Sequence, residues 1–382
     1  CAAYGGGGGL YQTTAYDSVV SNCYARSYGG GANTATISNS TIVLCRAASE
    51  CGGLNGGTAY DSTIDGCTAG SSGGMRGGTA YRTKIQNCSA TNYGGGFENS
   101  STLVDCVVSN CTAGSRGGGG GTSANRITGT LFIDNCSNTG SGLMFGGSSI
   151  VSNCTFVGNR GLGANLGQAI CSRTPTTTGM VVDSVITNNA GVGVRVTDAG
   201  GTNGASIVVR RCTINCTNET SLAVSVGKYE DDTRPQGIKL YDSFVSGPIR
   251  GSVDCYNCII SGVYSKSYSA VSCDAAVSSQ GKYLNLYNCN LVNNVSLASA
   301  GGCAGGLVNA YNTIVWQNEG VAGASDSFAT AVNCCIDVNP QLITGRLGLP
   351  YPTANSPCRT GGKVDAYELT EKDLAGQPRT SN

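Results

Sequence analysis

The densest group of side chains that could carry chemistry lies in the second half of the chain. It consists of Glu230, Asp231, Asp232 and Arg234, with Lys239 and Asp242 about one strand further on. A glycosidase needs only two carboxylates about 5 to 10 Å apart, and a polysaccharide lyase would combine calcium-binding carboxylates with an Arg or Lys base. The chain contains no histidine, which is the commonest general base. Because the group falls in the charged insertion Lys228–Pro235, we interpret it as a solvated loop and expect no catalytic residues.

Tyrosines followed by aspartate recur and could mark a second kind of site. Asp17, Asp61 and Asp242 share the word Tyr-Asp-Ser, so we interpret them as turn or surface residues of a repeat rather than a catalytic set. Tyr16, Tyr60 and Tyr81 occupy similar repeat positions and could form a stacked ladder. On the outside such a ladder would bind sugar rings or another protein. Because Ala precedes each tyrosine, we expect the ladder to fill an interior corner.

The 21 cysteines are the third group that could carry chemistry. Cys255-x-x-Cys258 has metal-ligand spacing, but no second such pair and no histidine accompanies it, so we expect no metal or cofactor site. Most cysteines instead follow an aliphatic residue by three positions, usually with Asn just before the cysteine. Examples are Val20–Cys23, Ile42–Cys45, Ile64–Cys67, Ile85–Cys88, Val108–Cys111, Ile133–Cys136, Val151–Cys154, Val209–Cys212 and Leu286–Cys289.

The first four of these cysteines are 22, 22 and 21 residues apart, and such a period is typical of a solenoid. The 59 glycines exclude helix pairs, and the short aliphatic and β-branched segments are typical of strands. Asn before the cysteine suits a bend, because Asn tolerates left-handed backbone. The sequence therefore predicts an all-β fold, a single-stranded right-handed parallel β-helix of roughly 14 to 16 coils.

Two segments follow from composition. We predict one β-helix over residues 1–337 and an irregular, proline-rich C-terminal tail or cap over 338–382, where five of the eight prolines lie. Proline-dense chain cannot join a central sheet.

The cysteines of the repeat are expected to be buried, mostly reduced thiols rather than disulfides. In-register Cβ atoms of neighbouring coils would lie about 4.8 Å apart, further than the roughly 3.8 Å that a disulfide requires. Pairs that break the period are better disulfide candidates: Cys45/Cys51, Cys106/Cys111, Cys212/Cys216 and Cys255/Cys258.

Charge and hydropathy exclude several classes of partner. The 23 basic and 23 acidic residues cancel, so we expect no nucleic-acid binding. No apolar run reaches 18 residues, so we expect no transmembrane helix. The chain starts at Cys1 and enters the repeat at once, which favours a processed or partial chain whose export signal has been removed.

Several segments carry a family resemblance. Val151–Asn159 and Asn312–Asn318 resemble β-helix repeats of bacterial surface proteins, among them the polymorphic outer-membrane protein type. The words Asn339-Pro-Gln-Leu-Ile, Ala354-Asn-Ser-Pro-Cys and Asp373-Leu-Ala-Gly-Gln-Pro-Arg resemble the end of the choice-of-anchor Q family. This resemblance implies a right-handed parallel β-helix in an exported or cell-surface protein and no single activity.

These features predict a non-catalytic extracellular structural or adhesive protein, at the cell surface or released from it. Its partners would be surface glycans, other proteins, or copies of itself assembled head-to-tail into a fibre through residues 338–382. The alternatives are a β-helix carbohydrate-active enzyme (polysaccharide lyase or glycoside hydrolase) and a sugar-binding module without turnover.

Overall fold

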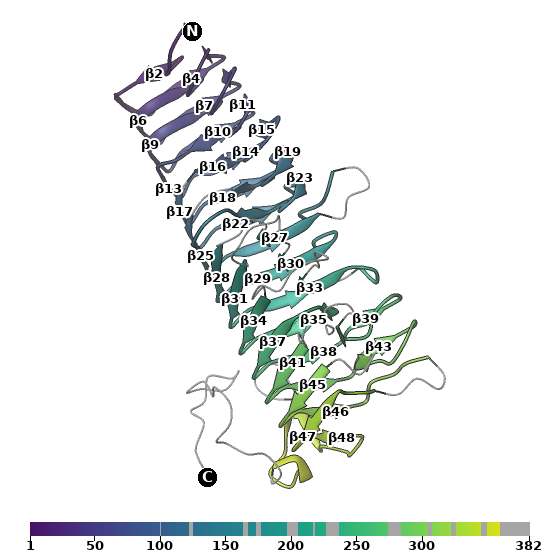
Figure 1. The fold of residues 1–382 in the computed structure, drawn as a ribbon. Coiled ribbons are helices and arrows are strands. Elements are labelled where there is room, and N and C mark those ends of the chain that lie inside the picture. Colours follow the sequence, from purple (N-terminus) through teal and green to yellow (C-terminus); the bar gives the residue numbers. More distant parts are fainter. Residues whose placement is uncertain are drawn as a thin grey trace. The chain divides into compact units, whose positions relative to one another are not determined.

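The computed structural model describes residues 1–99, 101–121, 125–162, 167–172, 177–196, 205–216, 218–226, 237–273, 284–304, 308–321, 326–344 and 350–359. They form two compact units that meet in sequence at Arg195 and Val196, and each is described by itself. Parallel strands dominate both units (Figure 1). The predicted all-β fold is confirmed, and the coils are of the right-handed type.

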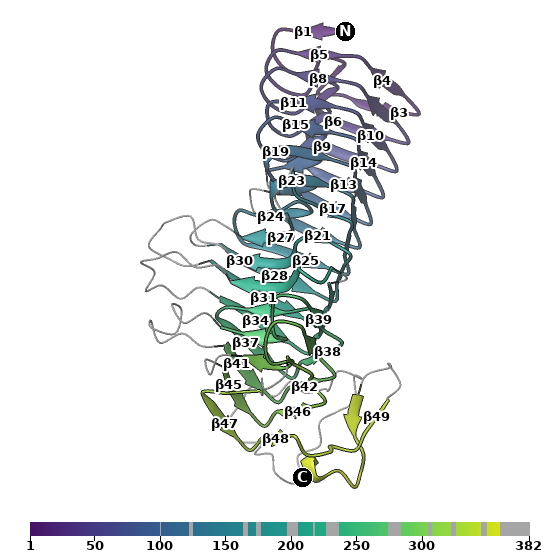
Figure 2. The same cartoon turned by 90° about the vertical axis from the view of Figure 1, so that its right-hand side faces the viewer.

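The coils of the first unit contribute strands to three faces, although the coils that contain β26 and β29 have no described strand on face A. Figure 2 shows the stacked coils from a second side. Face A contains β1 (Ala2–Ala3), β5 (Tyr24–Ala25), β8 (Arg46–Ala47), β11 (Thr68–Ala69), β15 (Ser89–Ala90), β19 (Thr112–Arg116) and β23 (Cys136–Thr139). Face B contains β2 (Leu10–Tyr11), β3 (Thr14–Tyr16), β6 (Ala32–Ser38), β9 (Leu54–Tyr60), β12 (Met75–Arg76), β13 (Thr79–Tyr81), β16 (Phe97–Glu98), β17 (Thr102–Val104), β20 (Gly120–Gly121), β21 (Arg126–Thr128), β24 (Leu143–Phe145), β25 (Ser149–Ser152), β27 (Gln168–Ser172), β28 (Thr178–Val182) and β30 (Val192–Val196). Face C contains β4 (Val19–Ser21), β7 (Thr41–Val43), β10 (Thr63–Asp65), β14 (Lys84–Gln86), β18 (Val107–Ser109), β22 (Leu131–Ile133), β26 (Thr155–Val157) and β29 (Val185–Thr187).

The second unit repeats the pattern with longer connections between strands. Ladders equivalent to face B contain β31 (Ser206–Arg210), β33 (Leu222–Val226), β34 (Gly237–Tyr241), β36 (Ile249–Arg250), β37 (Val253–Tyr256), β40 (Val271–Ser272), β41 (Leu284–Tyr287), β44 (Cys303–Ala304), β45 (Val308–Tyr311) and β47 (Thr330–Val332). Those equivalent to face C are β32 (Thr213–Asn215), β35 (Phe244–Ser246), β38 (Ile259–Ser261), β42 (Asn290–Val292), β46 (Ile314–Trp316) and β48 (Cys335–Ile336). Strands β39 (Tyr264–Ser265) and β43 (Val295–Ser296) pair separately. Among the described residues, 14 strands lie on face C or its equivalent. The solenoid has about 12 turns, fewer than the 14 to 16 coils expected.

Residues in left-handed backbone turn the chain at two corners of each coil in the first unit. Asn22, Asn87 and Asn110 have φ of 52°, 55° and 51°, as the Asn-Cys words predict. The prediction is wrong at Asn135, because the positive φ belongs to Asp134 (55°). Asn135 is instead buried and donates from Nδ2 to the Val108 carbonyl (2.9 Å) and to Asn159 Oδ1 (3.0 Å). Cys136 consequently begins strand β23.

In the first unit, the cysteines that follow an aliphatic residue by three positions lie mainly at two corners rather than in a single ladder. At the corner after face C, which we call the C–A corner, one buried ladder contains Cys23, Cys45, Cys67, Cys88 and Cys111. At the corner between faces B and C, which we call the B–C corner, Cys106 and Cys154 share a position with Ser40, Ser62 and Thr83. The same sequence motif occurs at both corners: an aliphatic strand residue, then a residue in left-handed backbone, then a cysteine. The sequence repeat alone therefore does not show at which corner a given cysteine lies.

Glycine pairs face the aliphatic and cysteine residues across the narrow coil. A Cβ placed on Gly74 would lie 2.5 Å from the Gly96 carbonyl oxygen, 2.7 Å from Ile85 Cγ2 and 3.1 Å from Cys88 Sγ. The word Gly-Gly therefore recurs because the space opposite each Ile-x-x-Cys is already filled.

The described cysteines form one disulfide, Cys335–Cys358. Of the suggested pairs, Cys45, Cys51, Cys106, Cys111, Cys255 and Cys258 are free thiols. The disulfide joins β48 to the tail, of which 338–344 and 350–359 are described. This part contains an antiparallel hairpin of β49 (Leu342–Thr344) and β50 (Pro350–Pro352) and the 3-10 helix η1 (Pro357–Arg359), so it is more regular than expected. The tail does not extend the parallel faces, in keeping with its prolines. Residues 360–382, including the word Asp373–Arg379, lie outside the described residues.

Candidate binding surface

The acidic group of Glu230, Asp231, Asp232 and Arg234 lies outside the described residues, as does the rest of Lys228–Pro235. Its two companions are described. Lys239 Nζ lies over the ring of Tyr256, 5.9 Å from its centroid, and Asp242 is 6% exposed at a turn with φ of 48°. Asp242 is thus a corner residue of the coil, as its Tyr-Asp-Ser word predicts.

The other two aspartates of that word are also turn residues. Asp17 and Asp61 have φ of 49° and 47° at the B–C corner, which confirms their interpretation as turn residues. Both are exposed. Within the described part of the chain, no group of three or more His, Cys, Asp or Glu side chains could hold a metal ion.

The tyrosines before these corners form a column on the outer surface of face B. Strand register aligns Tyr16 with Ser38, Ser38 with Tyr60, and Tyr60 with Tyr81. The expectation of an interior ladder is wrong, because Tyr16 is 67% exposed and Tyr60 is 38% exposed. Ala59 and Ala80, one residue earlier, are fully buried instead. Since strand side chains alternate between the two faces of a sheet, a buried alanine requires the next tyrosine to point outward.

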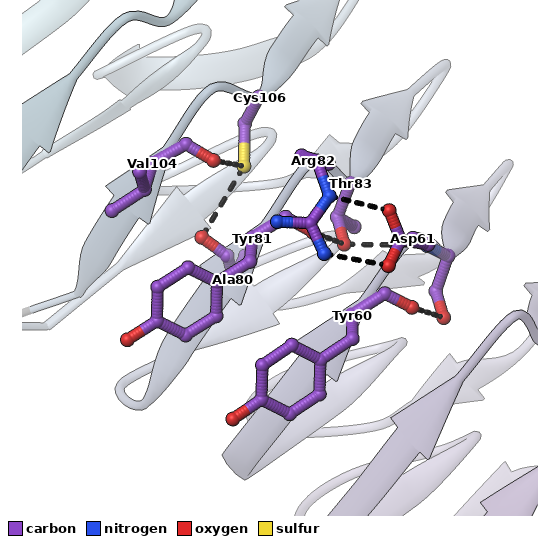
Figure 3. A network of polar contacts seen from close by, with 9 residues as sticks. Tyr60, Asp61, Ala80, Tyr81, Arg82, Thr83, Val104 and Cys106 are labelled. Carbon is purple, nitrogen blue, oxygen red and sulfur yellow. Dashed lines mark hydrogen bonds and ion pairs between the residues drawn. The ribbon is translucent and has the colours of Figure 1, made fainter.

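Tyr60 and Tyr81 are stacked in parallel with polar groups beside them, as Figure 3 shows. Their ring centroids are 5.1 Å apart and their planes differ by 4°. Arg82 donates from Nε to Asp61 Oδ1 (2.6 Å) and from Nη2 to Asp61 Oδ2 (2.7 Å). The hydrogen bond from Arg82 lowers the pKa of the Asp61 carboxyl, so the pair is ionised near neutral pH.

Hydroxyls below the column fix the backbone that carries the rings. Ser62 Oγ donates to the Tyr60 carbonyl (2.6 Å), and Thr83 Oγ1 donates to the Tyr81 carbonyl (2.9 Å). The backbone N–H of Ser62 in turn donates to Thr83 Oγ1 (3.4 Å). The corner is therefore hydrogen-bonded from coil to coil, which holds the two rings in register.

A column of threonines runs parallel to the tyrosines on the same outer surface. Its members are Thr14, Thr36, Thr58, Thr79 and Thr102, aligned by the pairing of successive strands. The motif Thr-Ala-Tyr thus places a hydroxyl and a phenol on either side of an alanine, which is fully buried at Ala59 and Ala80.

The second unit has a longer tyrosine column that the sequence reasoning missed. Tyr241, Tyr256, Tyr287 and Tyr311 are stacked with centroid separations of 4.8, 4.8 and 5.2 Å. Arg210 lies over Tyr241, the first ring of this column, with Cζ 5.0 Å from the ring centroid. The recurring words Tyr256-Asn-Cys, Tyr287-Asn-Cys and Tyr311-Asn-Thr were the signal that could have revealed it.

Face A of the first unit carries a hollow of about 360 Å³, lined by β8, β11 and β15. Its lining consists of Ala, Gly, Ser and Thr residues with Arg46 as the one charged side chain. It offers neither an acid–base pair nor an aromatic ring, so the tyrosine column of face B is the stronger candidate for recognition.

Comparisons with known proteins give no sequence-based relative. No protein-family model and no curated protein matches the chain. Among solved structures, pectate lyase Pel9A is similar at a TM-score of 0.34 and 10% identity, over 95% of this chain and 86% of that one. A hyper-glycosylated TibA fragment, with glycosylation catalysed by TibC, is similar at a TM-score of 0.23 and 13% identity, over 85% of this chain and 99% of the fragment. The choice-of-anchor Q resemblance is not confirmed by these comparisons. No helix of the described residues has the length and apolar character needed to cross a membrane.

Proposed function

We propose that this protein is a non-catalytic extracellular structural or adhesive protein whose outer surface binds other surfaces. The observation that carries the proposal is the outer surface of face B, where a column with Tyr16, Tyr60 and Tyr81 runs beside a column of exposed and half-buried threonines. A surface of this kind contacts an extended partner at many equivalent points, and many weak contacts add up to strong attachment. Tyrosine suits this role because its ring packs against apolar surface while its hydroxyl stays hydrated.

The fold supports a structural role of the same kind. Among the described residues, ladders of buried aliphatic, cysteine, serine and asparagine side chains run through neighbouring coils, as expected for a solenoid stabilised by neighbouring repeats. Free buried thiols do not depend on an oxidising compartment, whereas the Cys335–Cys358 disulfide is typical of exported proteins. The disulfide is therefore the structural feature that favours an extracellular location.

Retention on surfaces tests the proposal. The full chain would be incubated with a panel of insoluble polysaccharides and protein-coated beads, and both the bound protein and any released sugar products would be measured. We expect retention without product. The double variant Tyr60→Ala/Tyr81→Ala should reduce retention several-fold, since it removes the stacked pair.

Tyr11→Ala is the matched control, because Tyr11 is also exposed (57%) but belongs to another column, aligned with Asn33. Release of unsaturated or reducing sugars would contradict the proposal and favour a carbohydrate-active enzyme. Absence of retention on every surface would contradict it as well. Head-to-tail assembly through 338–382 remains a prediction beside this proposal.

A further inference from the structure

The tyrosine column of face B is interrupted at one position. In register order its first four members are Tyr16, Ser38, Tyr60 and Tyr81. Ser38 has no ring, so the face of Tyr60 that is directed away from Tyr81 is not covered by a neighbouring tyrosine. Tyr16 stands at the same strand position on the far side of Ser38. We call the space above Ser38, between Tyr16 and Tyr60, the Ser38 gap.

The coil spacing gives the Ser38 gap the width of one ring. Adjacent rings of this column are 5.1 Å apart, and each coil advances by about 4.8 Å. Two coil steps therefore separate Tyr16 from Tyr60 by about 10 Å. A ring inserted midway would lie about 5 Å from each tyrosine, within the range of roughly 4.5 to 7 Å at which aromatic rings pair.

Polar groups line one side of the Ser38 gap. The residues after Tyr16, Ser38 and Tyr60 are Asp17, Asn39 and Asp61, all in left-handed backbone at the B–C corner. Asn39 Nδ2 donates to Asp17 Oδ1 (2.5 Å), while Arg82 occupies both oxygens of Asp61. Thr36, half-buried and two residues before Ser38, lies on the opposite side. The gap thus combines flat apolar walls with hydrogen-bonding groups at its rim.

We propose that the Ser38 gap binds a neutral pyranose ring, as one unit of a glycan, between Tyr16 and Tyr60. A pyranose has C–H groups on its two faces, which pack on aromatic rings, and hydroxyls around its edge, which meet Asp17, Asn39 and Thr36. The Asp17 carboxylate disfavours sugars that carry a carboxylate or sulfate. An aromatic side chain of a protein partner would fit the same width, but its apolar edge would leave this polar rim without partners. The inference rests on the proposed adhesive function and names the ligand class of its surface.

Filling the gap is the sharpest test. Ser38→Tyr would supply the missing ring and make the column continuous from Tyr16 to Tyr81. Binding of neutral gluco-, galacto- and manno-configured oligosaccharides to the full chain would be measured by calorimetric titration and by saturation-transfer NMR. We expect at least one of them to bind, and Ser38→Tyr to weaken its binding at least tenfold while thermal stability stays equal or rises.

Tyr16→Ala removes one wall of the gap and should weaken binding to a similar degree, whether or not the Ser38→Tyr chain folds normally. Tyr11→Ala is again the control and should bind as the unchanged protein does. Binding that is insensitive to both Ser38→Tyr and Tyr16→Ala would overturn the inference, as would a complete lack of neutral-sugar binding.

The outcomes also separate this inference from the proposed function. If Ser38→Tyr is retained on surfaces as well as the unchanged protein, with sugar binding intact, the gap is not the site but adhesion stands. If a tyrosine-containing peptide binds in a Ser38-dependent way and no sugar does, the partner is a protein and the inference fails. If the unchanged protein is retained on no surface at all, the proposed function itself fails.

Discussion

Alkaline pH should destabilise this protein through its buried thiols. Burial raises the pKa of Cys51 and Cys88 well above the ordinary thiol value and raises that of Cys154 to about 11. The thiol is the neutral form, so the folded state holds its protons at a pH where the unfolded chain, with thiol pKa values near 8.5, releases them. Stability is therefore complete below about pH 8.5 and falls as the pH rises above it, until the folded-state pKa is reached.

The size of the effect follows from the linkage relation. Each pH unit between the two pKa values costs about 1.4 kcal/mol per thiol. At about pH 10, roughly 1.5 pH units above the unfolded value, each thiol costs about 2 kcal/mol and the three together about 6 kcal/mol, a large part of the 5 to 15 kcal/mol that holds a typical domain folded. The urea midpoint should therefore drop steeply between about pH 8 and pH 10.

The measurement is urea unfolding followed by circular dichroism, under argon and without reductant, so that Cys335–Cys358 stays intact. Because Tyr and Lys residues also titrate in this range, the informative quantity is the difference between variants. Cys88→Ala should lessen the loss at about pH 10 by about 2 kcal/mol, whereas replacing the exposed Cys1 should not change it. An unchanged pH dependence in Cys88→Ala would refute the reasoning, as would native thiols that titrate near pH 8.5.

Three further perturbations test the packing of the coils. Gly74→Ala should destabilise the protein by about 1 to 3 kcal/mol, because the new Cβ meets Gly96 and Ile85; Gly5→Ala, with nothing within 4 Å, is the control in the same urea experiment. Tyr287→Ala removes two stacked pairs, with Tyr256 and Tyr311, and should cost about 1 to 3 kcal/mol at about 0.5 to 1.5 kcal/mol per pair; a thermal midpoint equal to that of Tyr264→Ala would count against the stack. Cys358→Ser removes the disulfide that closes a loop of 23 residues, which is worth about 3 kcal/mol. Limited proteolysis should therefore cut within 338–359, while the β-sheet circular dichroism signal of the coils persists. Protease resistance equal to that of the unchanged protein would contradict this.

The repeat in the sequence was sufficient to predict the class of fold. The motif that contains Ile64 and Cys67 recurs at nearly constant spacing. Ile85 holds the place of Ile64 in the adjacent coil, and all three side chains are buried. The turn residues could also be predicted from the sequence, because Asn and Asp tolerate left-handed backbone. The exception at Asn135 shows the limit of the pattern. The neighbouring Asp134 can make the same turn. When the turn shifts by one residue along the chain, the side chain that points inward changes as well.

Assignment of cysteines to corners required the structure. Cys106 and Cys111 lie only five positions apart, and this spacing suggested a local disulfide. They follow β17 and β18, two consecutive strands of one coil, and are buried at different corners. The sequence could not distinguish the two corners, because the same sequence motif follows the strand at each of them.

The tyrosine column shows how the same interaction can serve both stability and recognition. In the second unit the rings of Tyr256 and Tyr287 are stacked on tyrosines on both faces, so their faces stabilise the coils and only their edges meet the solvent. In the first unit Ser38 interrupts the same geometry, and one face of Tyr60 is left for a ring from another molecule. The spacing that the coils impose on their own tyrosines is then the spacing that the ligand must match. A single serine in place of a tyrosine is therefore enough to change a structural stack into a binding surface.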